Sequence, residues 1–208
     1  MLMFLCLALF VGTPLRAAGT VGDFLFDALF SLLLVSGVIT VAQRPLLTVT
    51  VSALTTVTLV LRWASFESPE SALRFGGQAL TIVVLSILAA LVLWQVFREG
   101  PITAYRVQGA IVVYLLIGLV WAAAYELVRH LLPGAFQFAQ GGASEAGTTH
   151  GLVYFSFVTL TTVGYGDITP LHPVARSLAI AEALMGQLYP AILIARLVSM
   201  QISSRRAG

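Results

Sequence analysis

Residues 161–167 read Thr-Thr-Val-Gly-Tyr-Gly-Asp, and this stretch decides how the rest of the chain is interpreted. Gly164 and Gly166 flank Tyr165, and β-branched residues precede them. Because glycine adopts positive φ without steric cost, the segment can take an alternating backbone that ordinary residues resist. Such a backbone can turn successive carbonyl groups toward one side. Four copies around an axis would form stacked rings of carbonyl oxygens. Such rings can replace the hydration shell of a K⁺ ion.

The composition is that of an integral membrane protein. Hydrophobic residues make up 59% of the 208 residues and charged residues 10%, and the mean hydropathy is +0.96. Soluble domains are far more polar. The length suits about five or six spans of roughly twenty residues. A net charge of +2 gives no indication of nucleic-acid binding, and the single Cys6 excludes an intrachain disulfide and a cysteine-based metal site.

Hydropathy predicts six helical spans, at about residues 1–15, 22–42, 46–61, 78–97, 103–132 and 174–200. We expect a polar loop from Arg62 to Gly77 and a second, small-residue loop from Gln140 to Thr148. The first apolar run is short for a span, and the alternative is a signal peptide that ends near residues 17–19. The absence of a basic residue before this run favours the helix.

A short amphipathic segment, residues 149–160, leads directly into the glycine-rich stretch. It is too short to cross a bilayer, so we expect a re-entrant half-helix whose end is covered by protein or water. The order of elements is therefore helix, half-helix, glycine-rich stretch and helix.

This order, together with Thr-Val-Gly-Tyr-Gly at residues 162–166 and the following Asp167, resembles the potassium-channel family. The resemblance covers about half of the chain. It implies an all-α membrane protein with six transmembrane helices, a re-entrant pore helix and selectivity filter between the last two, and a homotetrameric pore. The expected units are a four-helix membrane domain at 1–101, a pore domain at 102–202 and a short cytoplasmic tail at 203–208. Within the pore domain we expect the outer helix at 103–132, the pore helix at 149–160, the filter at 161–167 and the inner helix at 174–200.

The resemblance implies that the filter, Thr162 to Gly166, binds K⁺ as the permeant ion. The ligands would be the carbonyl oxygens of Thr162, Val163, Gly164 and Tyr165, with the Thr162 hydroxyl at the inner end. No cofactor, no other metal and no catalytic residue is expected, because nothing in the sequence matches a catalytic triad, a phosphate loop or a metal-ligand cluster.

The predicted support of the filter departs from the familiar pattern of the family. Tyr154 and Phe155 stand where many members carry two tryptophans, and Val158 stands where some carry an acid. Phe155 cannot donate a hydrogen bond to Tyr165, whereas the Tyr154 hydroxyl could reach Asp167. We therefore expect a less polar support than in those relatives.

Two acidic residues lie within the predicted spans of the pore domain. Glu126 could brace the backbone at the filter exit or could pair with Arg129 one helical turn away, and both readings are open. Glu182 lies inside the last span, where a carboxylate usually faces protein or water. We expect it to bond within the subunit behind the filter; the alternative is that it tunes the cation concentration in the cavity.

The last span also carries the residues expected to take part in gating. Gly186 stands at the position of the family's hinge glycine, and Pro190 follows four residues later. Both weaken a helix locally, so we expect a bend near the cavity; the alternative is a packing glycine. The same alignment implies that Gln187 and Ile194 face the cavity.

The fourth predicted span, residues 78–97, contains no Arg or Lys, and Arg98 follows its end. A voltage sensor needs several basic residues on one helix. We therefore expect a passive, at most weakly voltage-dependent channel in the cell (inner) membrane, with the filter toward the outside and the C-terminus cytoplasmic. The first four helices would be a scaffold that could bind lipid or a regulatory subunit. The alternative function is a membrane subunit that has a channel-like pore but needs a partner to conduct, or serves a sensory or scaffold role.

Overall fold

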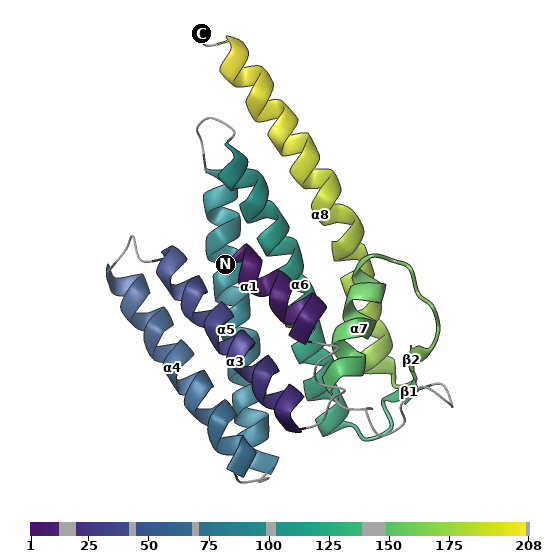
Figure 1. Ribbon diagram of the computed structural model, residues 1–208. Coiled ribbons are helices and arrows are strands. Elements are labelled where there is room, and N and C mark those ends of the chain that lie inside the picture. The colour runs from purple at the N-terminus through teal and green to yellow at the C-terminus, as the bar shows by residue number, and fades with distance from the viewer. Residues whose placement is uncertain (13–19, 42–44, 68–70, 99–102, 139–148, 207–208) are drawn as a thin grey trace.

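The computed structural model describes residues 1–12, 20–41, 45–67, 71–98, 103–138 and 149–206. Seven α-helices, one π-helical segment and two short strands make up this part of the chain (Figure 1). In chain order they are α1 (Leu2–Cys6), η1 (Leu7–Gly12), α3 (Thr20–Val41), α4 (Pro45–Glu67), α5 (Ser71–Phe97), α6 (Ala104–Leu131), β1 (Phe136–Phe138), α7 (Thr149–Leu160), β2 (Ile168–Pro170) and α8 (Pro173–Arg206).

Three stretches within the described helices are long and apolar enough to cross a membrane: Phe75–Phe97, Ala104–Leu131 and Pro173–Met200. They agree closely with the predicted spans at 78–97, 103–132 and 174–200. The apolar parts of α1 with η1, α3 and α4 are shorter, so the count of six spans stays a prediction. Of the predicted first span, residues 13–15 lie outside the described residues.

The prediction of a polar loop from Arg62 to Gly77 was wrong. Helix α4 continues to Glu67 and α5 begins at Ser71, so most of this segment is helical. Arg62 is accommodated because its Nε donates to Asp27 Oδ1 at 2.6 Å and its guanidinium lies 4.5 Å from the centre of the Phe30 ring. A paired arginine with an apolar stem fits a helix interface, whereas hydropathy alone assigns it to a loop.

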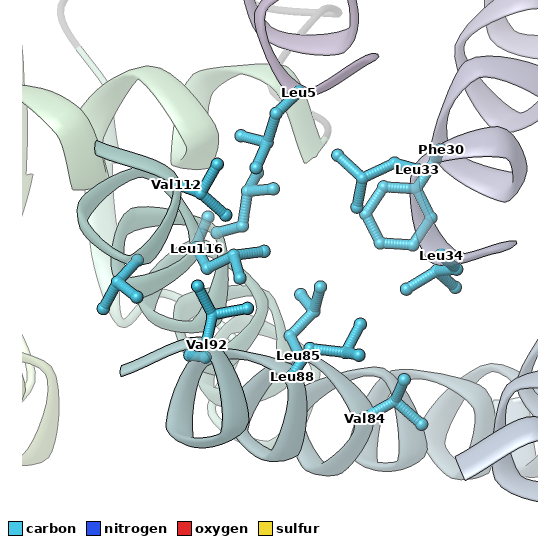
Figure 2. Close-up of a cluster of buried hydrophobic side chains, with 14 of the residues drawn as sticks. Leu5, Phe30, Leu33, Leu34, Val84, Leu85, Leu88, Val92, Val112 and Leu116 are labelled. Carbon is cyan, nitrogen blue, oxygen red and sulfur yellow. The ribbon is translucent and has the colours of Figure 1, made fainter. Parts of the chain in front are cut away.

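Of the N-terminal helices, α5 and α1 pack against α6, which belongs to the predicted pore domain. Figure 2 shows side chains of α1, α3, α5 and α6 that meet in one hydrophobic core. The labelled members are Leu5, Phe30, Leu33, Leu34, Val84, Leu85, Leu88, Val92, Val112 and Leu116. The Gln78 side chain adds a polar link, since its Nε2 donates to the Ala123 carbonyl of α6 at 3.2 Å. The N-terminal helices thus share one core with the outer helix of their own chain, and α5 and α1 contact that helix directly.

A second core lies beside the filter and includes a small sheet. The rings of Tyr125, Phe136 and Phe155 meet edge to face, with centroids 5.0 to 5.7 Å apart. Strands β1 and β2 pair antiparallel, with Phe136 opposite Pro170. The all-α expectation therefore missed a two-stranded sheet, which ties the segment after α6 to the segment after the filter.

Helix α8 extends beyond its predicted end. It was expected to stop near residue 200, but it continues to Arg206, which makes it 34 residues long. Residues 203–206, expected to be a tail, are therefore helical. In Figure 1 the C-terminal half of α8 projects past the other helices.

Candidate ion-conduction site

The filter begins where α7 ends, and its backbone amides bond back to that helix. The amide of Thr162 donates to the Thr159 carbonyl at 2.9 Å. The amides of Val163 and Gly164 donate to the Val158 carbonyl at 2.9 and 3.4 Å. The last carbonyls of a helix have no partner inside it, so these bonds satisfy both groups. They hold the N–H side of the filter toward α7.

The backbone of the filter alternates in the way expected of a Gly-x-Gly segment. Thr162, Gly164 and Gly166 have φ of +59°, +59° and +80°, whereas Val163 and Tyr165 between them do not have positive φ. Positive φ costs a β-branched residue such as Thr162 about 1–2 kcal/mol. The Gln187 side chain steadies this residue, since its Nε2 donates to Thr162 Oγ1 at 2.9 Å.

The carbonyl oxygens of Thr162, Val163, Gly164 and Tyr165 accept no hydrogen bond from the described part of the chain. All residues from 161 to 167 are exposed in the single chain. The C-terminal end of α7, which carries partial negative charge, lies directly beside them. Exposed carbonyl oxygens at the negative end of a helix are suitable ligands for a dehydrated cation.

The two aromatic residues expected to support the filter point in different directions. The Tyr154 ring is stacked parallel to the Tyr165 ring, with centroids 6.4 Å apart. A hydrogen bond from the Tyr154 hydroxyl to the Asp167 carboxylate stays a prediction. Phe155 instead lies in the core against Tyr125. Val158 contributes through its carbonyl, which accepts the filter amides.

Glu126 pairs with basic residues of its own helix. Its Oε1 lies 2.5 Å from Arg129 Nη2 and 3.2 Å from His130 Nε2, and its Oε2 accepts from Arg129 Nε at 3.2 Å. Of the two readings left open, the structure shows the pair with Arg129. A role as a brace of the filter exit stays a prediction.

Glu182 is fully buried, with an exposed fraction of 0%. Tyr125 Oη on α6 donates to its Oε2 at 2.5 Å, and Ser156 Oγ on α7 lies 2.5 Å from its Oε1. The carboxyl group therefore bonds within the subunit, as expected, and the cavity alternative does not fit its complete burial. Sequence reasoning missed Tyr125 and Ser156, because a lone tyrosine or serine in an apolar helix carries no signal.

The expected gating residues lie along one part of α8. Gly186 faces the end of α7 so closely that an added Cβ would lie 1.7 Å from the Leu160 carbonyl oxygen. This contact supports the packing alternative, and the hinge stays a prediction. Pro190 lies within the continuous helix, and Gln187 and Ile194 are exposed in the single chain.

The part of the chain that contains the filter is similar to known ion channels. Residues 109–202 match the family model described as ion channel. This region is similar to proteins that are named potassium channels. The match points to a channel protein rather than an enzyme. No solved structure matches the chain.

Three relatives illustrate the likeness of the channel region. Two pore potassium channel c of Oryza sativa subsp. japonica is 40% identical over 89 residues, which are 41% of this chain and 17% of the relative. Protein LctB of Geobacillus stearothermophilus is 41% identical over 69 residues, 31% of this chain and 51% of the relative. An inward rectifier potassium channel of Paramagnetospirillum magnetotacticum is 30% identical over 115 residues, 55% of this chain and 32% of the relative. The chain thus spans about half the length of these relatives or less.

Proposed function

We propose that the protein is a K⁺-selective channel that conducts passively through a homotetrameric pore. The alternating backbone of residues 162–166 carries the proposal, because it leaves a row of carbonyl oxygens without a partner in the described chain. The names of the relatives, two of them potassium channels, support K⁺ as the ion. The protein's part in conduction is to replace the water around the ion with oxygen ligands.

A tetramer is proposed because one filter cannot encircle an ion. In the single chain Val163 is 52% exposed and Tyr165 70% exposed, and both would pack behind the filter once copies assemble. Only 11% of the most apolar stretch of α8 is buried within the single chain. Its exposed apolar residues include Ile180, Leu184, Leu188 and Ile192, which recur at four-residue spacing. Neighbouring copies and lipid would cover these side chains.

We place the channel in the cell (inner) membrane, with the filter toward the outside and the end of α8 in the cytoplasm. This orientation follows the position of the filter in the family that the channel region resembles. The N-terminal helices would serve as a scaffold, since they share a core with α6. Membrane lipids would be their other contact.

The test is the reversal potential of the purified protein in a planar bilayer, with K⁺ on one side and Na⁺ on the other. A reversal near the K⁺ equilibrium potential is the expected result. A reversal near zero with robust current would overturn K⁺ selectivity and point to a differently built filter. An absence of current in protein shown to be tetrameric would instead favour the alternative, a membrane subunit that needs a partner to conduct.

The channel is expected to respond weakly to voltage. Helix α5 begins at Ser71 and therefore includes Arg74, which lies outside the predicted span of 78–97. The rest of the helix, residues 75–97, contains no Arg or Lys. Moving one elementary charge through 100 mV supplies only about 2.3 kcal/mol, so a steep response needs several charges.

Conductance recorded from excised liposome patches should therefore change shallowly across the accessible voltage range. Arg98 follows the end of α5, and its guanidinium lies 5.7 Å from the centre of the Trp94 ring. We expect this charge to contribute any weak voltage dependence, so Arg98→Gln should flatten the conductance–voltage curve further. A steep sigmoidal conductance–voltage curve from the pure protein would contradict the prediction.

A further inference from the structure

Three helices of the pore region meet at the Glu182 carboxyl group. On α6, Tyr125 Oη lies 2.5 Å from Glu182 Oε2. On α7, Ser156 Oγ lies 2.5 Å from Glu182 Oε1 and 2.7 Å from the Gly118 carbonyl oxygen of α6. These short oxygen–oxygen contacts are hydrogen bonds, and each of them needs a proton.

Counting protons assigns the protonation state of Glu182. The Tyr125 and Ser156 hydroxyls bring one proton each, and the Gly118 carbonyl brings none. With an ionised Glu182, two protons would serve three contacts, and Ser156 could not donate to both of its partners. A neutral Glu182 supplies the third proton. Tyr125 then donates to Oε2, the Glu182 hydroxyl donates to Ser156, and Ser156 donates to the Gly118 carbonyl.

The surroundings of Glu182 agree with a neutral acid. The groups that face it are Tyr125 and, within electrostatic range, Tyr114 on α6, and Ser156 on α7. Within the described residues, no arginine or histidine pairs with it. An ionised carboxylate that is fully buried in a membrane protein without a cationic partner is expensive, whereas a protonated one with satisfied hydrogen bonds is not.

We propose that Glu182 is held as a neutral carboxylic acid and is a positioning residue for the filter. The proposal rests on the proposed function as a K⁺ channel. Ser156 lies two residues before Val158, whose carbonyl accepts the filter amides of Val163 and Gly164. The hydrogen bonds of Ser156 to Gly118 on α6 and to Glu182 on α8 hold α7 in place, and this fixes the position of the Val158 carbonyl. Glu182 therefore acts on the ion-binding carbonyls through α7, without touching the ion.

The protonation state is tested by infrared spectroscopy of the reconstituted protein. The wild type should show the carbonyl stretch of a protonated carboxylic acid, and Glu182→Gln should remove it. Glu126→Gln is the matched control: Glu126 pairs with Arg129, so its removal should take away carboxylate absorption and leave the acid band. An acid band that persists in Glu182→Gln, or is absent from the wild type, would overturn the assignment.

The positioning role is tested by the permeability ratio of K⁺ to Na⁺. Glu182→Gln should keep this ratio within about twofold of the wild type, because the amide can donate to Ser156 and accept from Tyr125. Glu182→Met fills a similar volume but makes neither bond, so the ratio should fall by about tenfold. Ser156→Ala should lower it in the same direction, and it carries the test if Glu182→Met fails to assemble.

Two outcomes would overturn the positioning role while leaving the proposed function intact. An equal fall of the K⁺ to Na⁺ permeability ratio in Glu182→Gln and in Glu182→Met would mean that the site needs a charged carboxylate. Wild-type ratios in both variants, and in Ser156→Ala, would mean that the network does not position the filter. A wild-type protein without K⁺-selective current would instead overturn the proposed function, and the infrared assignment would be unaffected by that result.

Discussion

A Gly164→Ala substitution is expected to abolish the preference for K⁺ over Na⁺ while the protein still assembles. Gly164 has φ of +59°, and a Cβ added there would meet nothing within 4 Å. Within the single chain the substitution therefore causes no clash and acts through backbone strain of about 1–2 kcal/mol. The strain is relieved if the residue moves to negative φ, but this turns a carbonyl away from the row that Val163 and Tyr165 continue. The measurement is the shift of the reversal potential between K⁺ and Na⁺ solutions, from near the K⁺ value toward zero.

Gly134→Ala is the matched control for this prediction. Gly134 also has positive φ, +83°, and nothing lies within 4 Å of its added Cβ, but it lies in the turn between α6 and β1. It should cost a similar amount of stability and leave the reversal potential unchanged. If both variants lost selectivity equally, the effect would come from general destabilisation, and the role assigned to the Gly164 backbone would be wrong.

The parts of the fold that sequence predicted well are those specified by local chemistry. The pore helix was expected at 149–160, and α7 has these bounds. Its limits were readable because a polar loop precedes it and the glycine-rich filter follows. The filter alternation was also readable, because glycine takes positive φ without steric cost, and Gly164 and Gly166 both do so. Long apolar runs gave the positions of α5, α6 and α8 for the same local reason.

The parts that sequence missed depend on partners far away in the chain. Arg62 was assigned to a loop because its partner, Asp27, lies 35 residues earlier. The short strands β1 and β2 were missed because three residues show no periodicity, and they exist only because the fold brings them together. Glu182 was recognised as unusual, but its contacts with Tyr125 and Ser156 arise from the packing of α6, α7 and α8.

The same packing makes Gly186→Ala the most damaging glycine-to-alanine change among the described glycines of the pore region. An added Cβ at Gly186 would lie 1.7 Å from the Leu160 carbonyl oxygen and 2.7 Å from its carbon. A side chain could rotate away, but this carbonyl belongs to the last residue of α7. Relief requires α7 and α8 to move apart. We expect a cost at or above the 1–3 kcal/mol that is typical of overpacked cores, with loss of the tetramer on size exclusion and of K⁺ flux.

Two other glycines provide a graded comparison for this effect. At Gly118 the added Cβ would lie 2.6 Å from Phe157 Cζ, the end of a side chain, so Gly118→Ala should be milder. At Gly76, in α5, nothing lies within 4 Å, and alanine favours a helix, so Gly76→Ala should leave stability unchanged or slightly raised. Melting temperature and tetramer yield should therefore fall in the order Gly76→Ala, Gly118→Ala, Gly186→Ala.

The Gly186→Ala result also separates the two readings of this glycine. Glu182 and Gln187 lie on either side of it on α8, and they bond to Ser156 and to Thr162 of the filter. A separation of α8 from α7 would strain both bonds, so a packing glycine predicts that assembly and conduction fail together. A hinge predicts something else: Gly186→Ala would assemble with a normal yield, keep its reversal potential and change only the fraction of time that the pore is open. That outcome would contradict the contact with Leu160 as the reason for glycine, because a tetramer of normal yield could not contain the clash.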